Sequence, residues 1–132
     1  MNILDENISE NQAALLASWR IRFKQIGVNV GRSGMADDLV IPLLVRQPLP
    51  TFFTRDKGFY NSRRCHARYC LVFLDVRRNE TASFIRRLLR HPALNSRKKR
   101  MGKVIRASRG RITFWDVSEQ RREKELRWFA IA

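Results

Sequence analysis

The sequence TFFTRD at residues 51–56 has the pattern of a short buried strand that ends at a carboxylate. Open α/β sheets place their functional groups just beyond the carboxyl ends of parallel strands, so Asp56 is a candidate functional residue. Two other acidic points precede it. Asp5-Glu6 follows a strand-like segment at residues 2–4, and Asp37-Asp38 stands at the start of a predicted helix. We expect the three points to meet in one acidic pocket.

Predicted strands and helices alternate through the first two thirds of the chain. Ser9 has the form of a helix cap, and Gln12 would complete a capping box with it. A continuous apolar run at residues 69–74 predicts a strand that is buried on both faces. Asn79 then caps a predicted helix, which Pro92 ends. This alternation predicts a mainly parallel α/β sheet.

The region from residue 92 onward has a different pattern. Segments 104–107 and 112–115 flank a turn that contains glycine, which predicts a β-hairpin. The charge-rich segment 118–127 predicts a helix, and we expect the apolar end at 128–131 to dock on the domain or on a partner. The chain is thus expected to form a single domain over residues 1–132, with a basic hairpin and helical extension at 92–132.

Positive charge is concentrated in the second half of the chain. Residues 55–111 hold 18 of the 27 basic residues and 3 of the 12 acidic ones, so this segment carries the entire net charge of +15. An excess of this size indicates a polyanionic partner, nucleic acid before membrane. A solubilising surface, or a basic tail that binds RNA without chemistry, remains an alternative interpretation.

Several other classes of protein are disfavoured. No apolar run has the length needed to span a bilayer, and the acidic N-terminus lacks the pattern of a signal peptide, so we expect a cytoplasmic protein. Cys65 and Cys70 are expected to be free thiols. Their spacing relative to His66 and His91 matches no common zinc template, and neither histidine has a convincing nucleophile and acid around it.

Three carboxylates that meet in one pocket repel one another and stay ionised only beside a cation. Mg²⁺ and Mn²⁺ prefer oxygen ligands, and a bound metal can activate water and stabilise charge on a phosphodiester. Each acid also has an ordinary explanation. Asp37 is a suitable helix cap, Asp56 a suitable turn residue, and Asp5 a favourable charge before a helix.

Three short motifs together carry a family resemblance: LDENI at residues 4–8, GMADD at 34–38 and TRDKGF at 54–59. In this order and at these intervals they resemble the small PIN-like nuclease domains related to toxin–antitoxin ribonucleases. The resemblance is strongest over residues 1–60 and looser to about residue 91, and the last forty or so residues contribute nothing to it.

The resemblance implies a PIN-like three-layer α/β fold and a metal-dependent ribonuclease. The family's acidic site carries over to Asp5, Asp37 and Asp56 as catalytic and metal-binding residues for Mg²⁺ or Mn²⁺. Glu6 is a lesser candidate ligand, and Asp75 is another if its strand is adjacent and parallel, although a turn role suits it equally. The supporting groups would be Asn7 and Thr54.

Two departures from the family pattern leave an alternative open. The second Asp of the family's last motif is Gly58 here, so one possible ligand is absent. The Ser that precedes the helix Asp is replaced by Ala36, which removes a possible cap. A degenerate copy of the fold that binds RNA without cleaving it is therefore the alternative, and a basic interaction protein for an acidic partner chain is another.

Basic and aromatic side chains are interleaved after the third acidic point, an arrangement that suits phosphates and bases. The predicted partners are RNA, an antitoxin or other protein partner, and a second copy of the chain in a homodimer, with no membrane contact. The predicted nucleic-acid-binding residues are Arg55, Lys57, Arg63, Arg64, Arg68, Arg97, Lys98, Lys99 and Arg100.

Overall fold

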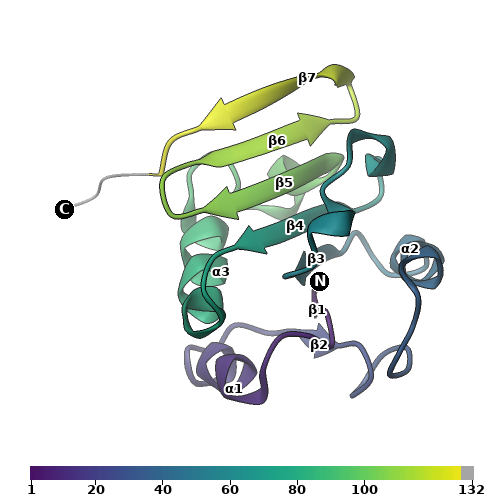
Figure 1. Ribbon diagram of the computed structural model, residues 1–132, viewed down its shortest axis with the longest axis vertical. Helices are drawn as coiled ribbons and strands as arrows, with labels where there is room; N and C mark the ends of the chain where they lie inside the picture. The colour runs from purple at the N-terminus through teal and green to yellow at the C-terminus, as the bar shows by residue number, and fades with distance from the viewer. Residues whose placement is uncertain (129–132) are drawn as a thin grey trace.

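A computed structural model describes residues 1–128 of the chain as one seven-stranded mixed sheet with helices on both faces (Figure 1). The strands are β1 (Asn2–Leu4), β2 (Lys24–Gln25), β3 (Thr51–Thr54), β4 (Cys70–Asp75), β5 (Lys103–Ser108), β6 (Ile112–Asp116) and β7 (Glu119–Leu126). The helices are α1 (Glu10–Ser18), α2 (Asp37–Val45), α3 (Thr81–Arg90) and α4 (Arg97–Arg100), with short 3-10 helices η1 (Lys57–Phe59), η2 (Ser62–Arg64) and η3 (Arg78–Glu80).

The strand order is β2-β1-β3-β4-β5-β6-β7. Strands β2, β1, β3, β4 and β5 are mutually parallel, whereas β6 and β7 are antiparallel additions at one side. The prediction of an α/β fold with a mainly parallel sheet is therefore confirmed, and so is the predicted hairpin, which is formed by β5 and β6.

Two buried clusters cover the two faces of the sheet and produce three layers. Neighbouring residues of β3 show the division, because Phe53 belongs to the cluster under α1 and α3, whereas Phe52 belongs to the cluster under α2. In Figure 1, α1 and α3 lie on one side of the sheet and α2 on the other. β4 supplies both clusters and is buried from Cys70 to Leu74, as its continuous apolar sequence predicts.

The predicted helix over 118–127 is wrong, since this segment forms β7. Asp116 accepts a hydrogen bond from the Ser118 amide at 3.0 Å in a tight turn, and β7 then pairs with β6 from Asp116↔Glu119 to Ile112↔Leu126. Glu, Lys and Arg are good helix formers, but the energy of helix propensity is small, and pairing with the open edge of β6 overrides it. The charged side chains suit an edge strand, because they discourage further pairing. Of the predicted apolar end, residues 129–131 lie outside the described residues.

The predicted capping groups of α1 and α3 have other roles. Ser9 occupies the N-cap position of α1, but its hydroxyl donates to the Asn11 side chain at 2.7 Å and caps no backbone amide. Gln12 is buried, and its Oε1 accepts from the Ala82 amide at 2.8 Å, so it joins α1 to the start of α3. Asn79 lies inside η3, ahead of α3, and is not its cap.

Helix α1 ends in a Schellman motif. The Ile21 amide donates to the Leu16 carbonyl and the Arg20 amide to the Ala17 carbonyl, both at 3.0 Å. Arg20 occupies the left-handed position of this motif, with φ of +61°, where glycine is usual. The chain then runs directly into β2.

No helix among the described residues has the length and apolar character required to cross a bilayer.

Candidate functional site

The acidic residues of the first and third motifs lie at the carboxyl ends of neighbouring parallel strands. Asp5 follows β1 directly, and Asp56 lies two residues beyond β3. The chain leaves β1 for β2 on one side and later returns to β3 on the other, so the strand order reverses between β1 and β3. Open α/β sheets bind ligands at such a reversal point. Asp37 reaches this edge as the first residue of α2.

The buried side chain of Thr54 connects two of the three acids. Its hydroxyl donates to Asp5 Oδ2 at 2.6 Å and accepts from the Asp56 amide at 3.0 Å. The other carboxylate oxygen of Asp5 accepts from the Glu6 amide at 2.8 Å. Burial raises the pKa of the Asp5 carboxyl, the hydrogen bonds from Thr54 and the Glu6 amide oppose this rise, and the charges of Glu6 and Asp56 add to it.

Asp37 and Asp56 face one another across Gly58. A Cβ placed on Gly58 would lie 3.2 Å from Asp56 Oδ1 and 3.5 Å from Asp37 Oδ2. Asp56 Oδ1 also accepts from the Gly58 amide at 2.8 Å, which fixes its orientation as the cap of η1. Burial raises the pKa of the Asp37 carboxyl, and the charge of Asp56 raises it further, whereas the Arg64 guanidinium opposes the rise.

This arrangement has the chemistry of an oxygen-ligand site, although its members are not all in ligating positions. Within residues 1–128, no group of three or more His, Cys, Asp or Glu side chains is arranged to hold a metal ion. Asp37 and Asp56 are brought together, whereas the Asp5 carboxylate is engaged by Thr54 and the Glu6 amide. The facing pair nevertheless fits a hard cation, because a cation between two carboxylates would replace repulsion with attraction.

Glu6 and Asn7 bind backbone amides of the neighbouring motifs. Glu6 Oε1 accepts from the Gly34 amide at 2.8 Å, and this bond attaches the loop before α2 to the end of β1. Asn7 Oδ1 accepts from the Arg55 amide at a longer 3.4 Å. The three motifs are therefore linked directly to one another. Asn7 thus contacts the backbone of the third motif, while Glu6 binds the loop before α2.

Asp75 lies at the end of β4, which is adjacent and parallel to β3. Its Oδ2 atom pairs with Arg106 of β5, with distances of 3.0 Å to Nε and 2.5 Å to Nη2. The carboxylate thus has a cationic partner already, and the contacts of the described residues do not join it to Asp5, Asp37 or Asp56.

The predicted nucleic-acid-binding residues divide into two groups at opposite ends of the strands. Arg55 and Lys57 follow β3 at the acidic end, and the Arg64 side chain reaches the same acids from η2. Arg63 lies beside Ser62 of η2, whose carbonyl accepts from Gln120 Nε2 at 2.9 Å near the start of β7. Arg64 lies over the buried Phe59 ring, 5.2 Å from its centroid, close enough for its charge to act on Asp37. Arg55 Nη2 donates to the Val76 carbonyl at 3.2 Å, so it joins the loops that follow β3 and β4.

The run at 97–100 lies at the amino ends of the strands instead. Arg100 is buried, with Nε donating to the hydroxyl of Thr51, the first residue of β3, at 2.9 Å and Nη1 donating to the Leu94 carbonyl at 2.8 Å. The prediction that Arg100 binds nucleic acid is therefore wrong, because its guanidinium is enclosed as a structural link. Arg97, Lys98 and Lys99 remain exposed, as does Arg68 just before β4.

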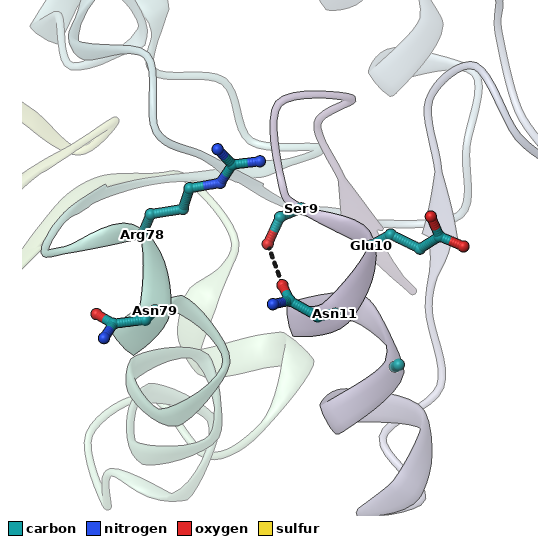
Figure 2. Close-up of a pocket in the computed structure, with 6 residues that line it drawn as sticks. Ser9, Glu10, Asn11, Arg78 and Asn79 are labelled. Atoms are coloured by element: carbon teal, nitrogen blue, oxygen red, sulfur yellow. Dashed lines mark hydrogen bonds between the residues drawn. The ribbon is translucent and has the colours of Figure 1, made fainter.

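A cleft beside the acidic edge contains residues that sequence reasoning missed (Figure 2). It has a volume of about 620 Å³ and lies between the start of α1, with Ser9 and Asn11, and η3, with Arg78 and Asn79. A second cleft of about 620 Å³ shares Arg78 and Ser9 and extends along Glu6 and Asn7. The position of Arg78 just after β4 was a usable signal, because the carboxyl ends of parallel strands meet at one edge.

Comparisons of this chain with protein-family models, with curated proteins and with solved structures returned no match.

The repulsion between Asp37 and Asp56 leads to a stability prediction. The unfolded chain releases the Asp37 proton at a lower pH than the folded chain, so wild type should lose stability relative to Asp37→Asn as pH rises above the ordinary Asp range. Asp37→Asn should therefore melt at a higher temperature than wild type at neutral pH, and the difference should vanish in acid. Thermal denaturation followed by circular dichroism measures this.

Asp38→Asn is the matched control, because Asp38 is exposed on the same turn of α2. Its removal loses only a favourable charge at a helix N-terminus and should lower the melting temperature slightly. A melting temperature for Asp37→Asn at or below that of Asp38→Asn at neutral pH would show that repulsion between Asp37 and Asp56 does not destabilise the fold.

Proposed function

We propose that this chain is a divalent-metal-dependent ribonuclease and that its catalytic residues are Asp5, Asp37 and Asp56. The observation that carries the proposal is the convergence of the three motifs at the β1/β3 reversal point. Two carboxylates face one another across Gly58, and Thr54 joins the third, that of Asp5, to the backbone amide of Asp56. Carboxylates that repel one another are uncommon in purely structural positions. Metal sites bring them together, because the bound cation offsets the repulsion.

The proposed metal is Mg²⁺ or Mn²⁺, held by Asp37 and Asp56 with Asp5 completing the set. Such an ion would activate a water molecule and stabilise the charge that develops on a phosphodiester. The chain's own residues have separate roles. Thr54 orients the Asp5 carboxylate and the Asp56 backbone, and Arg64, held over Phe59, supplies a positive charge beside the acids for a substrate phosphate.

The positive charge of the acidic end favours a nucleic acid substrate. Arg109 and Arg111 in the β5–β6 turn are paired with Glu80 at 2.7 Å and Glu125 at 3.7 Å. Lys57 and Arg78 have no ion pair within residues 1–128 and remain free to bind phosphate. This supports RNA binding along the same edge.

The three layers and the order of the motifs agree with a PIN-like fold, so we propose membership of that group on the resemblance together with the architecture. A toxin-type role, an antitoxin or other protein partner, a homodimer and a cytoplasmic location belong to the same proposal.

The second candidate function is a non-catalytic RNA-binding module. Gly58 favours it, because the family's additional Asp would project toward Asp37 and Asp56 from this position.

A cleavage assay tests the proposal. Wild type is incubated with RNA and with single-stranded DNA in Mn²⁺ or Mg²⁺ and then with a chelator, alongside Asp56→Asn. We expect RNA cleavage that the chelator abolishes and that Asp56→Asn lowers by a factor on the order of 10². Salt-sensitive RNA binding without cleavage under either metal would overturn the proposal in favour of the binding module.

Gly58→Asp gives a second, independent prediction. Its carboxylate would project toward Asp37 and Asp56, and the 3.2 Å contact requires Asp56 to shift by a few tenths of an ångström. We expect about tenfold tighter Mn²⁺ binding by calorimetry, because an added carboxylate increases the charge of the ligand set. Gly58→Asn has the same shape without the charge and should leave Mn²⁺ affinity near the wild-type value. Equal effects of the two substitutions would contradict the location of the site.

A further inference from the structure

Two adjoining clefts lie on the side of the molecule where α1 runs into β2. One, of about 420 Å³, is lined by Met1, Asn2, Arg22, Phe23 and Lys24. The other, of about 710 Å³, is lined by Ala17, Arg20, Ile21, Arg22, Phe23 and Asn29. Because they share Arg22 and Phe23, we treat them as one surface and call it the Arg20–Lys24 cleft.

The charged side chains of the Arg20–Lys24 cleft are all cationic. Arg20, Arg22 and Lys24 are exposed, no acidic residue lines either cleft, and none of the three forms an ion pair within residues 1–128. Burial lowers the pKa of the Met1 α-amino group, and the charges of Arg97 and Arg100 lower it further. Positive charge is therefore crowded beside the cleft, and an anionic ligand would relieve the repulsion.

Arg20 occupies a backbone position that an arginine fits poorly. Its φ of +61° is the left-handed conformation at the end of the Schellman motif, where glycine is least strained. The chain thus carries a cation at a site where a glycine would favour the fold. Strained backbone that persists in this way is associated with functional positions.

The cleft is separate from the acidic edge. Lys24 begins β2 and pairs beside Ile3, whereas Asp5 follows the carboxyl end of β1. The two-residue β2 separates the two regions by roughly 7 Å along the strand direction. Asn29, which lines the cleft, adjoins Val28, which lines the cleft beside Glu6 and Asn7. A single-stranded nucleic acid bound at one of these regions could therefore run along β2, at the edge of the sheet, to reach the other region.

We propose that the Arg20–Lys24 cleft is a second nucleic-acid-binding site, which holds single-stranded RNA away from the carboxylates. Phe23 is half-buried against the core cluster under α1 and α3 and lines both clefts, so the exposed part of its ring offers a surface for a base while the exposed cations on either side of it in sequence bind phosphates. The ring favours RNA over an acidic peptide, because carboxylates need no stacking surface. Binding here goes beyond the proposed nuclease function, since it requires neither metal nor cleavage.

The test measures RNA affinity in the full chain carrying Asp56→Asn, so that no cleavage interferes. A labelled single-stranded RNA is titrated by fluorescence anisotropy over a range of salt concentrations. We expect Arg22→Ser with Lys24→Ser to weaken binding about tenfold and to reduce the slope of log Kd against log salt by about 1.4. The control is Arg121→Ser with Arg122→Ser, which removes the same charge from β7 at the opposite edge of the sheet and should have a smaller effect on both quantities.

Arg20→Gly separates binding from folding. It relieves the left-handed backbone while removing a cation, so we expect a higher melting temperature together with weaker RNA binding. Equal losses of RNA affinity in the Arg22/Lys24 and Arg121/Arg122 double variants, or no loss in either, would overturn the proposal. If polyglutamate displaces the RNA and also binds the Arg22/Lys24 double variant about tenfold more weakly, the proposal would be overturned too, since the site would then serve an acidic protein. Absence of cleavage by wild type would leave these outcomes unchanged and would count against the nuclease proposal alone.

Discussion

The hydroxyl of Thr54 holds the acidic edge together by making two hydrogen bonds in a buried position. It donates to Asp5 and accepts from the Asp56 amide, so two segments far apart in sequence are fixed relative to each other. The parallel pairing of β1 with β3, with Leu4 beside Phe53, makes this contact possible. A buried polar group left without its partner costs about 1–3 kcal/mol, so the arrangement is strongly specified. The bond between Glu6 and the Gly34 amide adds the second motif to the same frame, and the contact of Asn7 with the Arg55 amide is a further connection between the first and third motifs.

The charge distribution follows from the same topology. Parallel strands direct all their carboxyl ends to one edge, and the facing acids Asp37 and Asp56 lie there with Arg64 beside them. The basic residues are divided between the two ends of the strands, and some of them are engaged in contacts within the fold. Arg100 is buried against Thr51, and burial lowers the pKa of its guanidinium. Arg106 and Arg109 neutralise Asp75 and Glu80. The cations of the Arg20–Lys24 cleft have no such ion pairs. They belong to the part of the sequence outside residues 55–111, whose basic and acidic residues are equal in number, so the net charge of that part does not reveal them.

The features that local pattern determines could be predicted from the sequence. The strand at 51–54, the buried run before Asp75 and the positions of Asp5 and Asp56 at strand ends all follow from short-range periodicity and parallel geometry. Features that depend on distant partners could not. Gln12 meets Ala82, and segment 119–126 becomes a strand because β6 offers an open edge. The left-handed turn after α1 has no local signal either, because arginine occupies the position where glycine is usual.

The carboxylates at the β1/β3 reversal point are proposed to form a divalent-metal site. Paramagnetic broadening by substoichiometric Mn²⁺, read from the backbone amide signals of the wild-type chain, tests it most directly. We expect the signals of Asp5, Asp37, Asp56 and Gly58 to broaden first, and we expect excess Mg²⁺ to restore them. Signals that remain sharp, or broadening centred first on other acids such as Asp116 and Glu119, would contradict it.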